Sequence, residues 1–150
     1  MNLFNIGFTK KSAKQFFELI NKNKIKLLID IRLYNKSQLA AFTKSEDLEY
    51  FLDKICSCKY QHCVEFAPTE EILNDYKNKK ISWSDYKKQY ANLIEERNRN
   101  SKCIDEFHER YTEFENVVLL CSEPTSNQCH RGVLSEIINK SDDGVKIINL

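Results

Sequence analysis

The side chains best suited to covalent chemistry lie in one short stretch of the chain. This stretch contains Cys121, Glu123, Cys129, His130 and Arg131. A thiol can act as a nucleophile, an imidazole or a carboxyl group can transfer a proton, and a planar guanidinium binds phosphate or carboxylate through its N–H donors. Together these residue types indicate a site that could act on an anionic substrate.

The stretch joins a predicted strand to a predicted helix. Residues 117–120 are β-branched and aliphatic, which is typical of a strand buried on both faces. Apolar residues of 134–138 recur at helical spacing, and Ser126 or Asn127 is the expected N-cap. Residues 129–131 then fall in or beside the first helical turn, where free backbone N–H groups favour anions and the ionised form of a thiol.

A purely structural interpretation is open for the same residues. A cysteine at the start of a helix is often a small buried residue, and Arg131 could pair with a carboxylate such as that of Glu123. Cys121 and Cys129 flank one loop, so a third interpretation is that the two thiols approach each other as a redox pair.

A pair of opposite charges follows the second strongly apolar run, residues 25–31. Asp30 and Arg32 are two positions apart, so on a strand they point to the same face and can meet at its carboxyl end. They form either a structural ion pair that orders the following loop or a contact to substrate.

The alternation of strand and helix patterns predicts an α/β fold. We expect one domain, residues 1–150, with a mainly parallel central sheet of about five strands and helices on both faces. The expected strands are 3–6, 25–31, 60–65, 117–120 and 145–148, and helical periodicity is seen near 13–20, 48–55, 70–76, 82–94, 104–111 and 128–138. Gly7 follows the first strand and is expected to permit an unusual backbone turn.

Composition narrows the class of protein further. Lys and Arg total 23 against 22 Asp and Glu, a net charge of +1, so binding to nucleic acid would need a local basic patch. The N-terminus lacks the pattern of a cleavable signal, and no apolar run is long enough to span a membrane. We therefore expect a cytoplasmic protein that does not act at a membrane.

The 6 cysteines are expected to be reduced thiols in such a chain. Cys56, Cys58, His62 and Cys63 are all zinc-ligand types, but they fall in one short segment rather than in two separated pairs. We therefore expect neither a metal site nor a cofactor.

Several motifs occur in an order that resembles the domain of unknown function 488 (DUF488) family. They are Gly7 after the first strand, Asp30-Ile31-Arg32 after the second, Ser37 in the next loop, and residues 120–123 followed by Cys129-His130-Arg131. Residues 66–69 and Ser82-Trp83 resemble a short-chain branch of the family. The resemblance covers nearly the whole chain and implies an α/β fold but no settled reaction.

Two family motifs are altered in this sequence. The usual opening, similar to Thr-Ile-Gly-His, is Asn5-Ile6-Gly7-Phe8 here, so its histidine is missing. The loop that contains Tyr34-Asn35-Lys36-Ser37 lacks the usual proline.

The leading hypothesis is an enzyme that acts on a nucleotide or a nucleic-acid-related anion. The expected catalytic residues are Cys129 as nucleophile and His130 or Glu123 for proton transfer; the expected substrate-binding residues are Arg32, Arg131, Asp30, Ser37 and Gly7. The alternatives are a non-catalytic phosphate- or nucleic-acid-binding module and a thiol redox protein that uses Cys121 and Cys129. The sequence leaves strand order and oligomeric state open.

Overall fold

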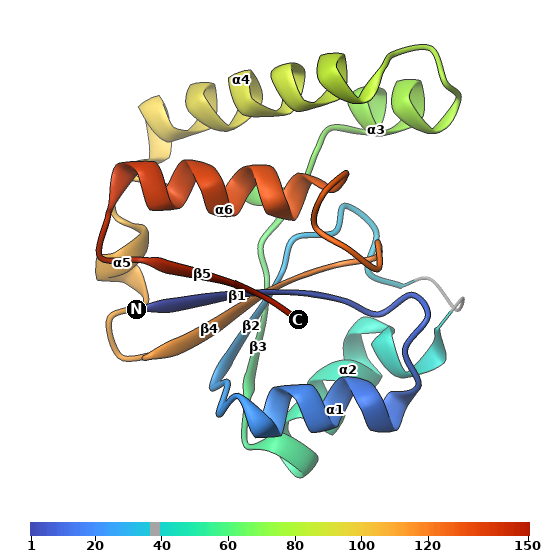
Figure 1. Cartoon of the computed structure of the whole chain (residues 1–150), viewed down its shortest axis with the longest axis vertical. Helices are drawn as coiled ribbons and strands as arrows, with labels where there is room; N and C mark the ends of the chain where they lie inside the picture. Colours follow the sequence, from blue (N-terminus) through green and yellow to red (C-terminus); the bar gives the residue numbers. More distant parts are fainter. Residues whose placement is uncertain (37–39) are drawn as a thin grey trace.

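The core of the protein is one sheet of five parallel strands in the order β3-β2-β4-β1-β5 (Figure 1). A computed structural model describes residues 1–36 and 40–150. The strands are β1 (Asn2–Gly7), β2 (Leu27–Asp30), β3 (Lys59–His62), β4 (Asn116–Cys121) and β5 (Lys146–Asn149). The predicted α/β class with a parallel sheet is confirmed.

Helices cover both faces of this sheet (Figure 1). On one face lie α1 (Ala13–Lys22) and α2 (Ser45–Phe51), which continues into a π-helical turn, Leu52–Cys56. On the other face lie α3 (Glu70–Lys77), α4 (Trp83–Ser101) and α6 (His130–Ser141). Helix α5 (Phe107–Arg110) and two short 3-10 turns, Ala41–Thr43 and Val64–Phe66, complete the described elements. None of the helices in the described part of the chain has the length and apolar character needed to cross a bilayer.

Strand β4 lies at the centre of the sheet and contributes to two hydrophobic cores. Val117 and Leu119 pack against α4 and α6 on one face, whereas Val118 and Leu120 pack on the side of α1. All four side chains are fully buried. The apolar run read from the sequence is therefore buried on both faces, as predicted, because helices cover both sides of a parallel sheet.

Three boundaries differ from the sequence-based expectation. The strand expected at 60–65 ends at His62, because Arg97 of α4 binds the carbonyl oxygens of Glu65 at 2.7 Å and Ala67 at 2.6 Å and turns the chain toward that helix. Helix α6 begins at His130 with Cys129 as N-cap, not Ser126, whose hydroxyl donates to Asn149 of β5. The helix expected at 104–111 is reduced to the single turn of α5.

The chain reverses its winding direction after β3 and returns to place β4 between β2 and β1. The connections after β1 and β2 pass to the face that holds α1 and α2, whereas the connection after β4 passes to the opposite face, where α6 lies (Figure 1). Because β4 is flanked by β1 and β2, the loops that leave these three neighbouring strands diverge at their carboxyl ends. Such a switch point is where open α/β sheets form ligand-binding crevices.

Gly7 ends β1 at this switch point, opposite Cys121 of β4. A Cβ atom at Gly7 would lie 1.7 Å from the carbonyl oxygen of Glu123 and 3.2 Å from Nη1 of Arg131. No glycine in the described chain has a positive φ, so the unusual turn expected at Gly7 is wrong. Gly7 is required instead because the loop after β4 passes too close for any side chain.

We expect Gly7→Ala to destabilise the fold by about 1–3 kcal/mol, because the added methyl group must displace the Glu123 carbonyl. Urea unfolding followed by circular dichroism measures the change. Gly144→Ala is the matched control, because the nearest atoms to its Cβ belong to the side chains of Asp142 and His108 and not to the backbone. Equal unfolding midpoints for the two variants would contradict the steric account.

Candidate functional site

A cleft of about 1120 Å³ opens at the switch point. It is lined by the loop after β1, the loop after β2, part of α3, and the segment that joins β4 to α6. Its wall includes Cys121, Cys129 and His130. The carboxyl edge of the sheet therefore gathers the predicted reactive residues, whereas Glu65, from the end of β3, points away to an ion pair with Arg110 at 3.3 Å.

Two thiols and an imidazole form a compact cluster in this wall. The Sγ atoms of Cys121 and Cys129 and a ring nitrogen of His130 all lie within 4.8 Å of one another. Cys121 is the last residue of β4, Cys129 is the N-cap of α6, and His130 is the first residue of that helix. All three side chains are at most 5% exposed, so this cluster is buried at the base of an open cleft.

The ring of His130 is oriented by a backbone carbonyl. Its Nε2 lies 3.1 Å from the oxygen of Ile31, and because a carbonyl only accepts, Nε2 carries a hydrogen. Nδ1 therefore faces the sulfur of Cys121 at 3.7 Å and the hydroxyl of Tyr86 at 3.4 Å. Burial alone would lower the pKa of His130. The negative charge of Cys121 and the hydrogen bond to its sulfur outweigh burial, so this pKa is raised above its usual value.

The two thiols share their protons unequally. A hydrogen bond from Cys129, together with His130 and Arg131, holds the pKa of Cys121 well below its usual value despite burial. The same hydrogen bond and burial raise the pKa of Cys129. These directions favour Cys121 as the thiolate and Cys129 as its hydrogen-bond donor.

Arg131 provides a buried positive charge next to this pair. It is 1% exposed, and its Nη1 donates to the carbonyl oxygen of Glu123 at 2.7 Å and approaches Sγ of Cys129 at 3.6 Å. Its Nε has no hydrogen-bond partner among the described residues. No carboxylate oxygen of a described residue lies within 4.0 Å of the guanidinium nitrogens, so Arg131 forms no ion pair there. The expected alternative, a salt bridge to the Glu123 side chain, is replaced by a bond to its backbone. Because a buried charge needs compensation, the thiol pair is the natural carrier of the opposite charge.

Asp30 and Arg32 meet at the end of β2, as their spacing predicts. Nε and Nη2 of Arg32 contact the two carboxylate oxygens of Asp30 at 2.9 and 2.6 Å, and Nη2 also donates to the Thr43 carbonyl at 2.7 Å. The hydroxyl of Tyr60 donates to Asp30 at 2.8 Å. Arg32 lines the cleft, but its hydrogen bonds tie the loop after β2 to the sheet, which is the structural interpretation of the pair.

Lysines supply the cleft with positive charge that the sequence analysis did not assign. Lys10, Lys11, Lys77 and Lys79 line the cleft, and Glu123 is the acidic residue among the described lining residues. Burial lowers the pKa of Lys11, and the charge of Arg131 lowers it further. Their sequence position could have predicted this for Lys10 and Lys11, because both follow β1 closely at the edge of the sheet where ligands bind. These four lysines form a local basic patch, although the net charge of the whole chain is only +1.

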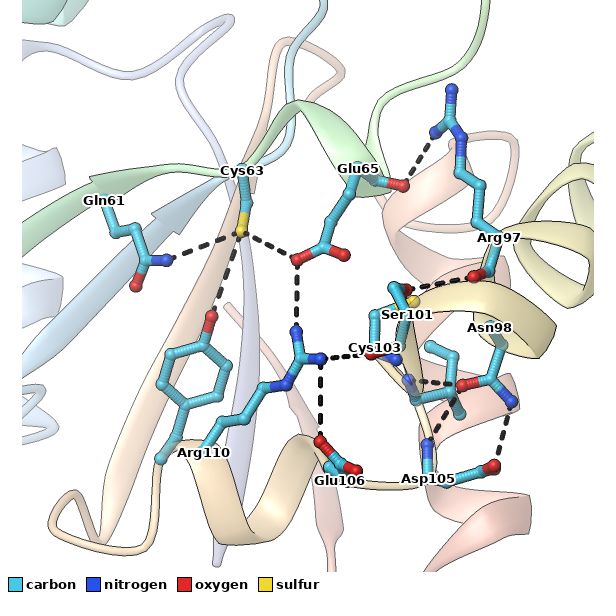
Figure 2. Close-up of polar contacts among 12 residues, drawn as sticks. Gln61, Cys63, Glu65, Arg97, Asn98, Ser101, Cys103, Asp105, Glu106 and Arg110 are labelled. Carbon is cyan, nitrogen blue, oxygen red and sulfur yellow. Dashed lines mark hydrogen bonds and ion pairs between the residues drawn. The ribbon is translucent and has the colours of Figure 1, made fainter.

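The remaining cysteines serve as core residues. Cys63 contacts the hydroxyl of Tyr111 at 3.8 Å beside a polar network in which Arg110 pairs with Glu65 and Glu106 (Figure 2). Burial raises the pKa of Cys63, so its thiol stays neutral.

Cys56 and Cys58 are also kept neutral, because burial raises their pKa values to about 11 and about 12. They pack in the core under α1, on the opposite face of the sheet from Cys63, so these three cysteines form no common ligand set.

By proximity alone, Cys121, Cys129 and His130 are a possible metal-ligand group among the described residues. The positive charges of Arg131 and Lys11 beside them oppose a cation and favour an anion. Three other predicted site residues remain. Glu123 lines the cleft, Gly7 packs beneath the loop that contains Glu123, and Ser37 lies outside the described residues.

The fold and the site define an α/β protein with a buried thiol pair at a basic switch-point cleft. The sequence model of the family described as domain of unknown function DUF488 matches residues 12–138, which include Asp30, Arg32 and the whole 121–131 stretch. The chain therefore belongs to the DUF488 family. No curated protein and no solved structure gave a match.

We expect Asp30→Asn to destabilise the protein by about 3–5 kcal/mol, because it leaves the buried Arg32 without its counter-charge. Urea unfolding at neutral pH measures this loss. Asp53→Asn is the control: its partner Lys54 is 61% exposed, so the unfolding midpoint should not move. If both substitutions had equally small effects, groups other than Asp30 would have to stabilise the buried charge of Arg32.

We expect Cys129→Ala to move the alkylation profile of Cys121 to higher pH. The substitution removes the hydrogen bond that lowers the pKa of Cys121, so the thiolate protonates at a higher pH than in the wild type. The rate of iodoacetamide modification against pH, with the modified residue located by mass spectrometry, gives the profile. Cys129→Ser keeps a donor and should shift it less; identical profiles for all three proteins would refute the proton-sharing pair.

Proposed function

We propose that this protein is an enzyme that uses the Cys121–Cys129 thiol pair to attack an anionic, nucleotide- or nucleic-acid-related substrate. The observation that carries the proposal is the buried guanidinium of Arg131, which lacks a carboxylate partner among the described residues and contacts Sγ of Cys129 behind the wall of a basic cleft. A cation in this position stabilises a thiolate, and a thiolate is the nucleophilic form of cysteine.

In this mechanism, the sulfur of Cys121 forms a bond to an electrophilic atom of the substrate, and the bond to the leaving group breaks. The pKa directions support Cys121 as the attacking atom, whereas sequence position alone pointed to Cys129. His130 or Glu123 supplies a proton to the leaving group: the imidazole faces the sulfur, and the Glu123 side chain is exposed in the cleft.

The lining of the cleft supports an anionic substrate with a ring. Four lysines are available to contact it directly, because Arg32 is occupied by Asp30 and Arg131 is not among the described lining residues; they are Lys10, Lys11, Lys77 and Lys79. Tyr34 lines the same cleft and is 56% exposed, so its ring is available to stack on a base. A volume of about 1120 Å³ is large enough for a nucleotide.

Iodoacetate is an anion, whereas iodoacetamide is neutral. We expect the ratio of the iodoacetate rate to the iodoacetamide rate to be higher for Cys121 than for free cysteine. The lysine-lined cleft concentrates anions near the thiolate, by about tenfold for a steered ligand at low salt. The ratio of the two rates in the wild type, Lys11→Gln and Lys22→Gln measures this effect.

Lys11→Gln should reduce the ratio, and added salt should do the same. Lys22→Gln is the matched control, because Lys22 lies in the last turn of α1, away from the cleft lining, and should leave the ratio unchanged. A wild-type ratio equal to that of free cysteine would contradict anion recruitment to the thiolate.

A second measurement separates an enzyme from a binding module. Inorganic phosphate, AMP and short single-stranded DNA are tested for thermal stabilisation, and each ligand that stabilises the wild type is tested for turnover and for a covalent adduct by intact mass. An enzyme should lose turnover in Cys121→Ser while still binding. Salt-sensitive binding without adduct or turnover in the wild type would instead support the phosphate-binding module.

A further inference from the structure

The spacing of the two thiols points to an activity that needs no anionic substrate. The Sγ atoms of Cys121 and Cys129 lie within 4.8 Å of each other and both line an open cleft. A disulfide requires about 2.05 Å between the sulfurs, so the two must approach by at most about 3 Å. We propose that Cys121 and Cys129 reduce a hydroperoxide and form a reversible disulfide.

The backbone provides for this approach. Cys121 is fixed in the centre of the sheet, because β4 pairs with β1 on one side and β2 on the other. Residues 122–128 consist of bends and turns without helix or strand, and Cys129 follows them in an extended conformation with φ −141° and ψ 141°. Cys129 lies outside the sheet, so its sulfur can approach Cys121 without breaking a hydrogen bond between strands.

The environment assigns a role to each sulfur. Cys121 faces Nδ1 of His130 at 3.7 Å, so the imidazole stabilises negative charge on this sulfur. Nη1 of Arg131 approaches Sγ of Cys129 at 3.6 Å and adds a positive charge beside the pair. The lowered pKa of Cys121 and the raised pKa of Cys129 agree with this assignment. Cys121 then corresponds to the thiol that attacks peroxide, and Cys129 to the thiol that resolves the product.

The Cys121 thiolate attacks the distal oxygen of ROOH, an S–O bond forms, the O–O bond breaks, and the alkoxide leaves as ROH with a proton from His130 or water. The Cys129 thiol then attacks the sulfenic sulfur, an S–S bond forms, the S–O bond breaks, and water leaves with the thiol proton. Two electrons pass from the dithiol to the peroxide, and an added dithiol such as dithiothreitol restores the reduced pair.

The test uses the whole reduced protein with one equivalent of hydrogen peroxide and no other substrate. We expect the wild type to lose 2 Da and two titratable thiols, with peptide mapping linking Cys121 to Cys129, and dithiothreitol to reverse all three changes. Cys129→Ser should stop at a sulfenic acid on Cys121 that dimedone traps, and Cys121→Ser should slow peroxide consumption by about tenfold or more.

Cys103→Ser is the control, because Cys103 is a buried thiol whose pKa is raised, and the substitution should leave the reaction unchanged. A wild-type protein that forms no Cys121–Cys129 link, or that reacts no faster than Cys121→Ser, would overturn the proposal. The mapping is done on the wild type, so it does not depend on any variant folding. Because no anionic substrate is present, the result is independent of the proposed enzymatic function.

Discussion

The guanidinium of Arg131 is a full positive charge in a nearly inaccessible position, and no described carboxylate neutralises it. An isolated buried charge is strongly unfavourable, so its neighbours must provide both hydrogen-bond acceptors and negative charge. The Glu123 carbonyl provides an acceptor, and Sγ of Cys129 lies 3.6 Å from Nη1, so negative charge on the thiol pair would be stabilised here. The bond to Glu123 holds its loop close to Gly7, and the charge of Arg131 adds to the effects of Cys129 and His130 that lower the pKa of Cys121.

The parallel sheet explains why this charge lies beside reactive groups rather than in an ordinary core. The loops after β1 and β2 turn to one face of the sheet and the loop after β4 turns to the other, which leaves a cleft where β4 ends and α6 begins. The strand fixes Cys121, the helix start fixes Cys129 and His130, and Ile31 at the end of β2 orients the imidazole. The cluster thus combines one strand–loop–helix segment with a carbonyl about a hundred residues earlier in the chain.

Local pattern was sufficient to predict the elements and part of the site. The doubly buried run at β4, the helical periodicity of α1 and the same-face spacing of Asp30 and Arg32 are properties of neighbouring residues, and all appear in the structure. The N-cap of α6, the lysines of the cleft and the uneven thiol pair depend on contacts between distant segments. For example, Ser126 binds Asn149 of β5, which no local rule predicts.

Arg131 binds the backbone carbonyl of Glu123 and not its side chain, so the backbone and the side chain of residue 123 have separate roles. The carbonyl secures the loop, whereas the exposed side chain faces the cleft and makes no bond on which the loop relies. Substitution at position 123 can therefore alter what the cleft accepts without undoing the scaffold, while changes at 7 and 131 are constrained together. Positions 7 and 131 are therefore constrained by the scaffold, whereas any constraint on the side chain at position 123 comes from the cleft.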